Sequence, residues 1–102
     1  MTVRYRFAWN PEKARSNEAK HGVSFEEART VLGDALAATL FDDEHSENEE
    51  RWATIGRNAT GRLLVMVHTF ETTREPDVLM VRIISAREPT RRERETYESK
   101  QQ

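Results

Sequence analysis

Two arginines in the stretch VRIISAR are the side chains with the clearest chemical potential. Arg82 interrupts an apolar run and Arg87 ends it. A guanidinium group binds two phosphate oxygens at once and keeps its charge at any relevant pH, so the pair predicts a phosphate clamp. In a regular strand, positions 82 and 87 face opposite sides, and a twist or bulge near Ser85 is needed to bring them together. The alternative is that Arg82 is an edge residue or the partner of a carboxylate.

Lys20 and His21 place two further cations side by side, directly before Gly22. Glycine takes the left-handed conformation that ends many helices, and cations are favoured at the negative end of the helix dipole. The simpler interpretation is therefore a helix cap. The alternative is a cationic corner that contacts an anionic ligand.

Side chains of these types are sufficient to cut RNA without a metal ion. One group removes the proton of a 2′-hydroxyl, a second protonates the leaving oxygen, and cations stabilise the charge on phosphorus. The histidines, His21, His45 and His68, lack the spacing of two ligands one helical turn apart. Glycine-rich phosphate loops and serine triads are also missing from the sequence. We therefore expect no metal site and no other cofactor.

Charge is unevenly distributed along the 102 residues, although the formal net charge is only -2. Residues 42–50 contain six acidic side chains and no lysine or arginine, which leaves 16 basic and 12 acidic side chains elsewhere. This acidic segment is predicted to be a solubilising or partner-facing loop. The chain has no cysteine, and its longest apolar run, residues 63–67, is far shorter than the roughly 20 residues that span a bilayer. We expect a single cytoplasmic domain, residues 1–102, with no membrane segment.

Periodicity and capping residues predict the elements that position these side chains. Apolar residues alternate from 3 to 9, which predicts a strand. Asn10 and the proline after it predict a helix that ends at Gly22. A capping box beginning at Ser24 predicts a second helix to about Leu32.

Strands and a last helix are predicted in the second part of the chain. Four apolar segments read as strands, at residues 36–41, 51–57, 63–70 and 78–87. A second capping box, from Thr90 to Glu93, predicts a C-terminal helix whose only large apolar residue is Tyr97, with Glu93 in ordinary surface ion pairs. The order is β-α-α-β-β-β-β-α. We expect an α+β fold, a mostly antiparallel sheet with the two N-terminal helices on one face.

Four segments, taken together and in this order, resemble the BrnT family of ribonuclease toxins from bacterial type II toxin-antitoxin systems. They are FAWNPEKARSNEAKHGVSFEEA, DDEHSENEERWATIG, GRLLVMVHT and RIISAREPTRRERETYE. The resemblance implies a RelE-like fold and metal-independent RNA cleavage that inhibits translation. It also implies neutralisation by a BrnA-type antitoxin, a ribbon-helix-helix protein that binds operator DNA and represses the shared operon.

The resemblance also assigns a set of active-site residues by position. These are Lys20, His21, Arg51, Arg62, Arg82, Arg87 and Tyr97. Arg82 and Arg87 are the expected phosphate and transition-state stabilisers. The general base stays open between His21, Glu50 and Lys20.

The sequence departs from the family pattern in two places. Asn10 stands where the family commonly has an aspartate, and the segment ETTREPD is longer than usual. The net acidity fits a protein that meets RNA on the ribosome or in a local basic cleft.

Two other functions are compatible with the same residues. A non-catalytic binding module that acts as a corepressor would use the same cations, and a metal hydrolase would require a chelatable ion.

Overall fold

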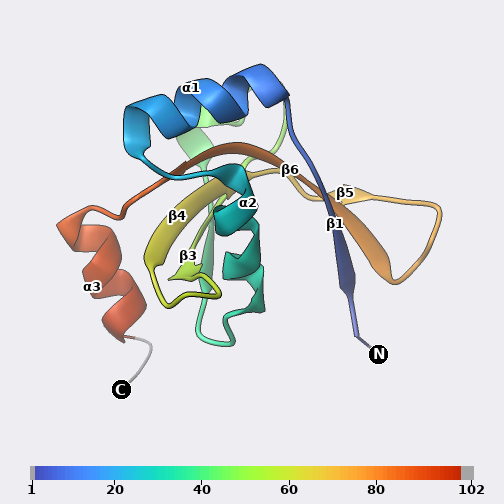
Figure 1. The fold of residues 1–102 in the computed structure, drawn as a ribbon. Coiled ribbons are helices and arrows are strands. Elements are labelled where there is room, and N and C mark those ends of the chain that lie inside the picture. Colours follow the sequence, from blue (N-terminus) through green and yellow to red (C-terminus); the bar gives the residue numbers. More distant parts are fainter. Residues whose placement is uncertain (1, 100–102) are drawn as a thin grey trace.

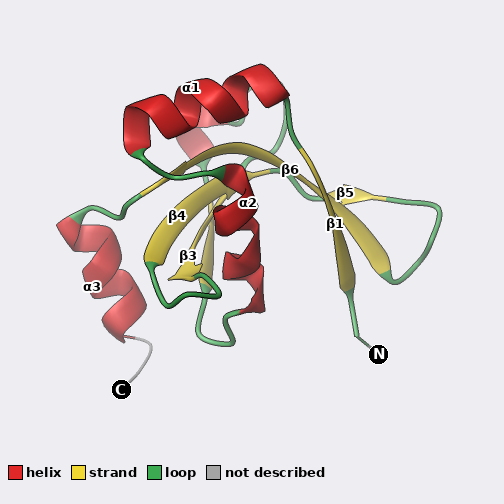
Figure 2. Cartoon of the chain, in the orientation of Figure 1, coloured by secondary structure: helices red, strands yellow, loops and turns green. Residues whose placement is uncertain are grey.

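The computed structural model describes residues 2–99, which form three α-helices, two short 3₁₀ helices and six strands (Figures 1 and 2). In chain order the elements are β1 (Arg4–Ala8), α1 (Pro11–His21), α2 (Phe25–Ala28), η1 (Arg29–Gly33), β2 (Ala38–Phe41), η2 (Asp43–His45), β3 (Trp52–Arg57), β4 (Leu63–His68), β5 (Glu71–Thr72), β6 (Val78–Arg87) and α3 (Arg91–Ser99), with η1 and η2 the 3₁₀ helices. The α+β class is confirmed. No described helix has the length and apolar composition needed to cross a membrane.

The sheet is mostly antiparallel, as expected, and one edge pairing is parallel, which makes it a mixed sheet. Its strand order is β1-β6-β4-β3-β2, with β5 also pairing β6. The pairings β2–β3, β3–β4, β4–β6 and β5–β6 are antiparallel, whereas β1 runs parallel to β6. Alternation within a strand carries no information about the direction of a distant neighbour, so the pairing of the first and last strands was not visible in the sequence.

The order of helices and strands along the chain differs from the predicted order by one additional short strand, β5. The predicted strand at 63–70 ends at His68, and β5 forms between the predicted strands at 63–70 and 78–87. The predicted strand at 78–87 matches β6 at both ends.

Helix α1 begins and ends as its capping residues predict. The Asn10 side chain accepts hydrogen bonds from the amides of Glu12 and Lys13, at 2.8 and 3.3 Å. Gly22 ends the helix with a φ of 68° and donates its amide to Glu18 O at 2.8 Å. The asparagine therefore performs the capping function without a carboxylate.

The second predicted helix divides into α2 and η1. Ser24 Oγ accepts from the Glu27 amide at 3.0 Å, but the Glu27 carboxylate binds Arg62 at 2.8 Å instead of returning to the Ser24 amide. Half of the predicted capping box is therefore present, and the helix tightens to 3₁₀ geometry after four residues.

The two faces of the sheet carry different cores. Helices α1 and α2 lie over one face (Figure 1), where α2 contributes buried apolar residues that join those of β4 and β6 and α1 contributes the partly buried Ala14. This main core consists of Val23, Phe25, Ala28, Val31, Leu64, Met66, Val81, Ile83 and Ala86. On the opposite face, Tyr97 of α3 packs on Ile55, Leu63 and Val65. Helix α3 covers this second face beside β3.

A bulge in β6 brings Arg82 and Arg87 to the same side of the sheet. Ile83 pairs with His68 and Ser85 pairs with Val67, so β6 contains one extra residue at this point. Ile83 and Ala86 consequently both point into the main core, although three positions separate them. Arg82 and Arg87 alternate with these residues and face the second side of the sheet. The bulge near Ser85 is therefore the irregularity that the two arginines need to share one side.

Candidate functional site

A hollow of about 470 Å³ lies on the second face of the sheet, beyond the area that α3 covers. Its floor includes Ala53, Val67 and Ser85, which are neighbours across β3, β4 and β6. Arg51 and Arg87 line it as well. We call it the arginine hollow. The small side chains of its floor leave the two guanidinium groups accessible from above.

A second hollow of about 260 Å³ lies between α1 and β6. Lys20 and His21 line it from the helix, and Ile84 and Ser85 line it from the bulge. We call it the corner hollow. Because Ile84 and Ser85 also line the arginine hollow, the two hollows adjoin across the bulge. The fold therefore brings the helix corner to the bulge that also borders the arginine hollow.

Arg82 and Arg51 share one carboxylate of the acidic segment. An Arg82 guanidinium nitrogen, Nη2, contacts Oε2 of Glu49, and Arg51 Nη2 lies 3.4 Å from Oε1. The hydrogen bond from Arg82 is the main cause of a lowered pKa of Glu49. Arg82 Nε also lies 3.9 Å from the carboxylate of Glu71. The acidic segment was predicted to face solvent or a partner, and this contact with the site was missed.

Arg87 has a different carboxylate partner, Glu93 of α3. Its two Nη atoms donate to the two Glu93 oxygens at 2.7 and 2.9 Å. Glu93 also accepts from the Thr90 amide at 2.8 Å, while Thr90 Oγ1 accepts from the Glu93 amide at 3.2 Å. The predicted capping box is thus confirmed, but the prediction that Glu93 makes only surface pairs is wrong. The bidentate bond from Arg87, with the Thr90 amide, lowers the pKa of Glu93 to about 2.

The low pKa of Glu93 predicts acid sensitivity of folding. Because the ordinary value is 4.5, the ionised form stabilises the folded state above about pH 5, and this contribution disappears as the pH falls toward 2. Through this carboxylate the wild type should lose about 2 kcal/mol of unfolding free energy as the pH falls, a figure reduced for partial exposure. We expect Glu93→Gln to lack this pH-dependent loss. Urea unfolding at pH 5, 4 and 3 measures it. Glu95→Gln, which changes an exposed carboxylate of the same helix, should retain the wild-type pH dependence.

Arg62 supports the corner from outside the two hollows. Its Nη1 donates to Gly22 O at 3.3 Å and to Glu27 Oε1 at 2.8 Å, and its Nη2 lies 3.9 Å from Glu88. Arg62 is not among the residues that line either hollow. These contacts hold the glycine that follows His21, so the geometry favours a positioning role for Arg62.

Tyr97 lies away from the two hollows that the other predicted site residues line or border. Its side chain is 1% exposed, and its hydroxyl donates to Asp34 Oδ2 at 2.6 Å. Arg57 lies over the ring, 5.6 Å from its centroid. Burial and the hydrogen bond to Asp34 raise the pKa of the Tyr97 hydroxyl. A ring held in this way is an anchor for α3 and cannot stack on a base in this structure.

His68 and His45, the other two histidines, are each hydrogen-bonded within the protein. His68 is fully buried, with its Nε2 2.7 Å from Thr54 Oγ1 and its Nδ1 3.1 Å from Thr69 O. Burial lowers its pKa, so the ring is neutral and belongs to the core. His45 pairs with Asp42 on the acidic segment at 3.0 Å. Among residues 2–99, no group of three histidine or acidic side chains is arranged to hold a metal ion.

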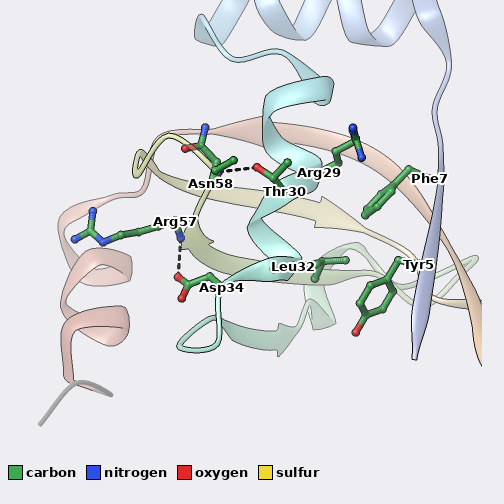
Figure 3. A pocket seen from close by; sticks show the side chains of 10 residues that line it. Tyr5, Phe7, Arg29, Thr30, Leu32, Asp34, Arg57 and Asn58 are labelled. Carbon is green, nitrogen blue, oxygen red and sulfur yellow. Dashed lines mark hydrogen bonds between the residues drawn. The ribbon is translucent and has the colours of Figure 1, made fainter. Parts of the chain in front are cut away.

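A larger hollow, of about 710 Å³, contains none of the predicted site residues (Figure 3). Tyr5 and Phe7 of β1 lie on one side of it and Arg57 on the other, with η1 between them. The Arg57 amide donates to Asp34 Oδ2 at 2.8 Å, which ties the end of β3 to the chain after η1. This hollow is formed by the packing of η1 and lies apart from the cationic residues of the site.

Comparisons with known proteins agree with this architecture. Residues 9–93 match the family described as "Ribonuclease toxin, BrnT, of type II toxin-antitoxin system". The crystal structure of the Brucella abortus ribonuclease toxin BrnT is similar over 87% of this chain and 100% of that chain, with a TM-score of 0.54 and 21% sequence identity. At this identity the structural likeness supports the fold alone. Comparison with curated proteins gives no match. Because the family match covers most of its length, the chain belongs to the BrnT family of ribonuclease toxins of type II toxin-antitoxin systems.

Proposed function

We propose that this protein is a metal-independent endoribonuclease whose active site spans the arginine hollow and the corner hollow. The observation that carries the proposal is the meeting of cations from separate elements at the β6 bulge. Lys20 and His21 line one hollow, and Arg51 and Arg87 line the adjoining one. Arg82 lies on the same face as Arg87 and shares Glu49 with Arg51. Such a row of cations fits the backbone of a single RNA strand.

The chemistry that fits these side chains is attack by the RNA 2′-hydroxyl on its own phosphate. A bond forms between the 2′-oxygen and phosphorus, and the bond between phosphorus and the 5′-oxygen breaks. The products are a 2′,3′-cyclic phosphate and a 5′-hydroxyl. The arginines stabilise the additional charge on the phosphate oxygens. His21 is the proposed carrier that takes the proton of the 2′-hydroxyl and returns it to the 5′-oxygen, because an imidazole both accepts and donates protons and this one lines a hollow. Glu50 is exposed and lines neither hollow. Lys20 then contributes charge.

The biological setting proposed here follows from membership of the family. A type II system pairs the toxin with a protein antitoxin, and we propose a BrnA-type ribbon-helix-helix protein that forms a hetero-oligomer with this chain. Through that antitoxin the complex would bind operator DNA and repress its own operon. We further propose a RelE-like fold, a cytoplasmic location, and inhibition of translation by cleavage of mRNA, either free or on the ribosome.

Incubation of the purified, antitoxin-free protein with total cellular RNA in EDTA tests the proposal. We expect cleavage that leaves 2′,3′-cyclic phosphate ends, detected by end-specific ligation, and no cleavage by a folded Arg82→Ala, Arg87→Ala double variant. Cleavage that EDTA abolishes would assign the chemistry to a metal ion. If neither protein cuts free RNA, the same comparison on translating ribosomes separates ribosome-dependent cleavage from a non-catalytic binding module.

A further inference from the structure

The arginines of the second sheet face are held by carboxylates in two different ways. Glu93 is fixed, because it binds Arg87 through both oxygens and also caps α3 through the Thr90 amide. Its side chain is 25% exposed. A ligand that displaced it from Arg87 would disturb the helix cap as well. This pair is therefore a structural unit.

Glu49 is held by arginine side chains rather than by a helix cap. It contacts Arg82 and Arg51, and its side chain is 36% exposed. The acidic segment around it is fastened independently, since the Asp42 amide donates to Arg51 O at 2.9 Å and the Arg51 amide donates to Ser46 Oγ at 3.0 Å. Rotation of the Glu49 side chain can therefore release both arginines while these bonds remain.

Arg51 has donor capacity that Glu49 does not use. Its Nε is buried and has no hydrogen-bond acceptor among residues 2–99. A buried donor without an acceptor is unfavourable when water does not reach it. A phosphodiester carries the same single negative charge as a carboxylate and offers its anionic oxygens together with two bridging ones. It is therefore better suited than Glu49 to serve two guanidinium groups at once.

We propose that Arg51 and Arg82 form the subsite for an RNA phosphate, and that Glu49 occupies this subsite in the free protein as an internal competitor. The inference rests on the proposed function, since it names the phosphate-binding part of the same site and its regulation. An entering phosphate takes the two guanidinium groups, and the Glu49 carboxylate turns into solvent. The contact lowers affinity for RNA without blocking the site, because a partly exposed ion pair is weak and is readily exchanged for another anion.

Binding of a single-stranded 2′-O-methyl RNA oligonucleotide, which cannot be cleaved by 2′-hydroxyl attack, tests the subsite apart from catalysis. Fluorescence anisotropy would measure its Kd for the wild type, Glu49→Gln, Glu47→Gln and Arg82→Ala, and for Glu49→Gln combined with Arg82→Ala. Glu47 belongs to the same acidic segment and is exposed, so Glu47→Gln makes the same change in net charge. We expect Glu49→Gln to bind about threefold more tightly than Glu47→Gln, and this gain to vanish in the Arg82→Ala background.

The outcomes separate this inference from the proposed function. Equal affinities of Glu49→Gln and Glu47→Gln, or a gain that persists without Arg82, would overturn the competitor role of Glu49. Absence of binding, or binding that Arg82→Ala leaves unchanged, would overturn the subsite, even if the protein cleaves natural RNA. Arg82-dependent binding by a protein that cleaves no RNA would overturn the ribonuclease proposal and leave the subsite in place.

Discussion

Arg82→Ala is expected to lower kcat/KM for RNA cleavage by about 10²–10³-fold, the loss typical of removing one donor that stabilises a developing charge. Arg82 lies on the open face of β6, and its guanidinium group contacts the carboxylate of Glu49. Its side chain is 38% exposed, so alanine leaves no cavity in the main core. We therefore expect the melting temperature to stay within a few degrees of the wild-type value.

The matched control for this variant is Arg91→Ala. Arg91 is 94% exposed and pairs only along its own helix with Glu95, among the described ion pairs. Arg91→Ala removes the same unit of charge as Arg82→Ala, so this variant reports the general electrostatic contribution to RNA binding. We expect less than a threefold change for Arg91→Ala, consistent with a screened surface charge. A comparable loss in both variants would show that net charge, and not the position of Arg82, determines the rate.

Tyr97→Ala is expected to destabilise the protein by about 3–5 kcal/mol, the range for truncating a large buried aromatic side chain. Tyr97 is the buried residue of α3, and it packs on Ile55 and Val65 of the second core. Its loss removes this anchor of a helix that is otherwise polar on its described surface. Urea unfolding at pH 7 measures the change.

Tyr97→Phe distinguishes an anchor from a catalytic residue. The ring remains, while the hydroxyl that donates to Asp34 at 2.6 Å is lost, which we expect to cost about 1–2 kcal/mol. Asp34 keeps the amides of Arg57 and Leu36 as donors. Cleavage below the melting temperature should stay within about twofold of wild type, because the hydroxyl touches no substrate in our assignment. A large loss of kcat with an intact fold would return Tyr97 to the active site.

Local signals in the sequence were sufficient to predict most elements of this fold. Asn10 and Gly22 mark the ends of α1 because caps act within one helical turn, and the apolar run at 78–87 marks β6 for the same local reason. The parallel pairing of β1 with β6 could not be predicted in this way. It depends on contacts between residues about 74 positions apart, such as Arg4 and Val78, which leave no periodic trace.

The candidate site was predictable in its residue types and less so in its geometry. The corner of α1 and the arginines of β6 were found from motif and resemblance, and the structure places them around one bulge. The roles of Glu49 and Glu93 were missed, because a carboxylate in a charged segment reads as solvated until its partner is known. Tyr97 was assigned to the site by resemblance. As the sole large apolar residue of a polar helix it also carries a signal for burial, and the structure buries it.

The extra residue at the β6 bulge lets two arginines at an odd spacing face the same side of the sheet. Arg82 and Arg87 are five positions apart, so in a regular strand without the bulge Arg87 would face the main core. Deleting the extra residue, Ile84, would keep Ser85, Ala86 and Arg87 opposite Val67, Met66 and Val65, and Arg87 would keep its side in a regular strand. Among related chains, an odd spacing between these two arginines therefore predicts a bulge, and an even spacing predicts a regular strand.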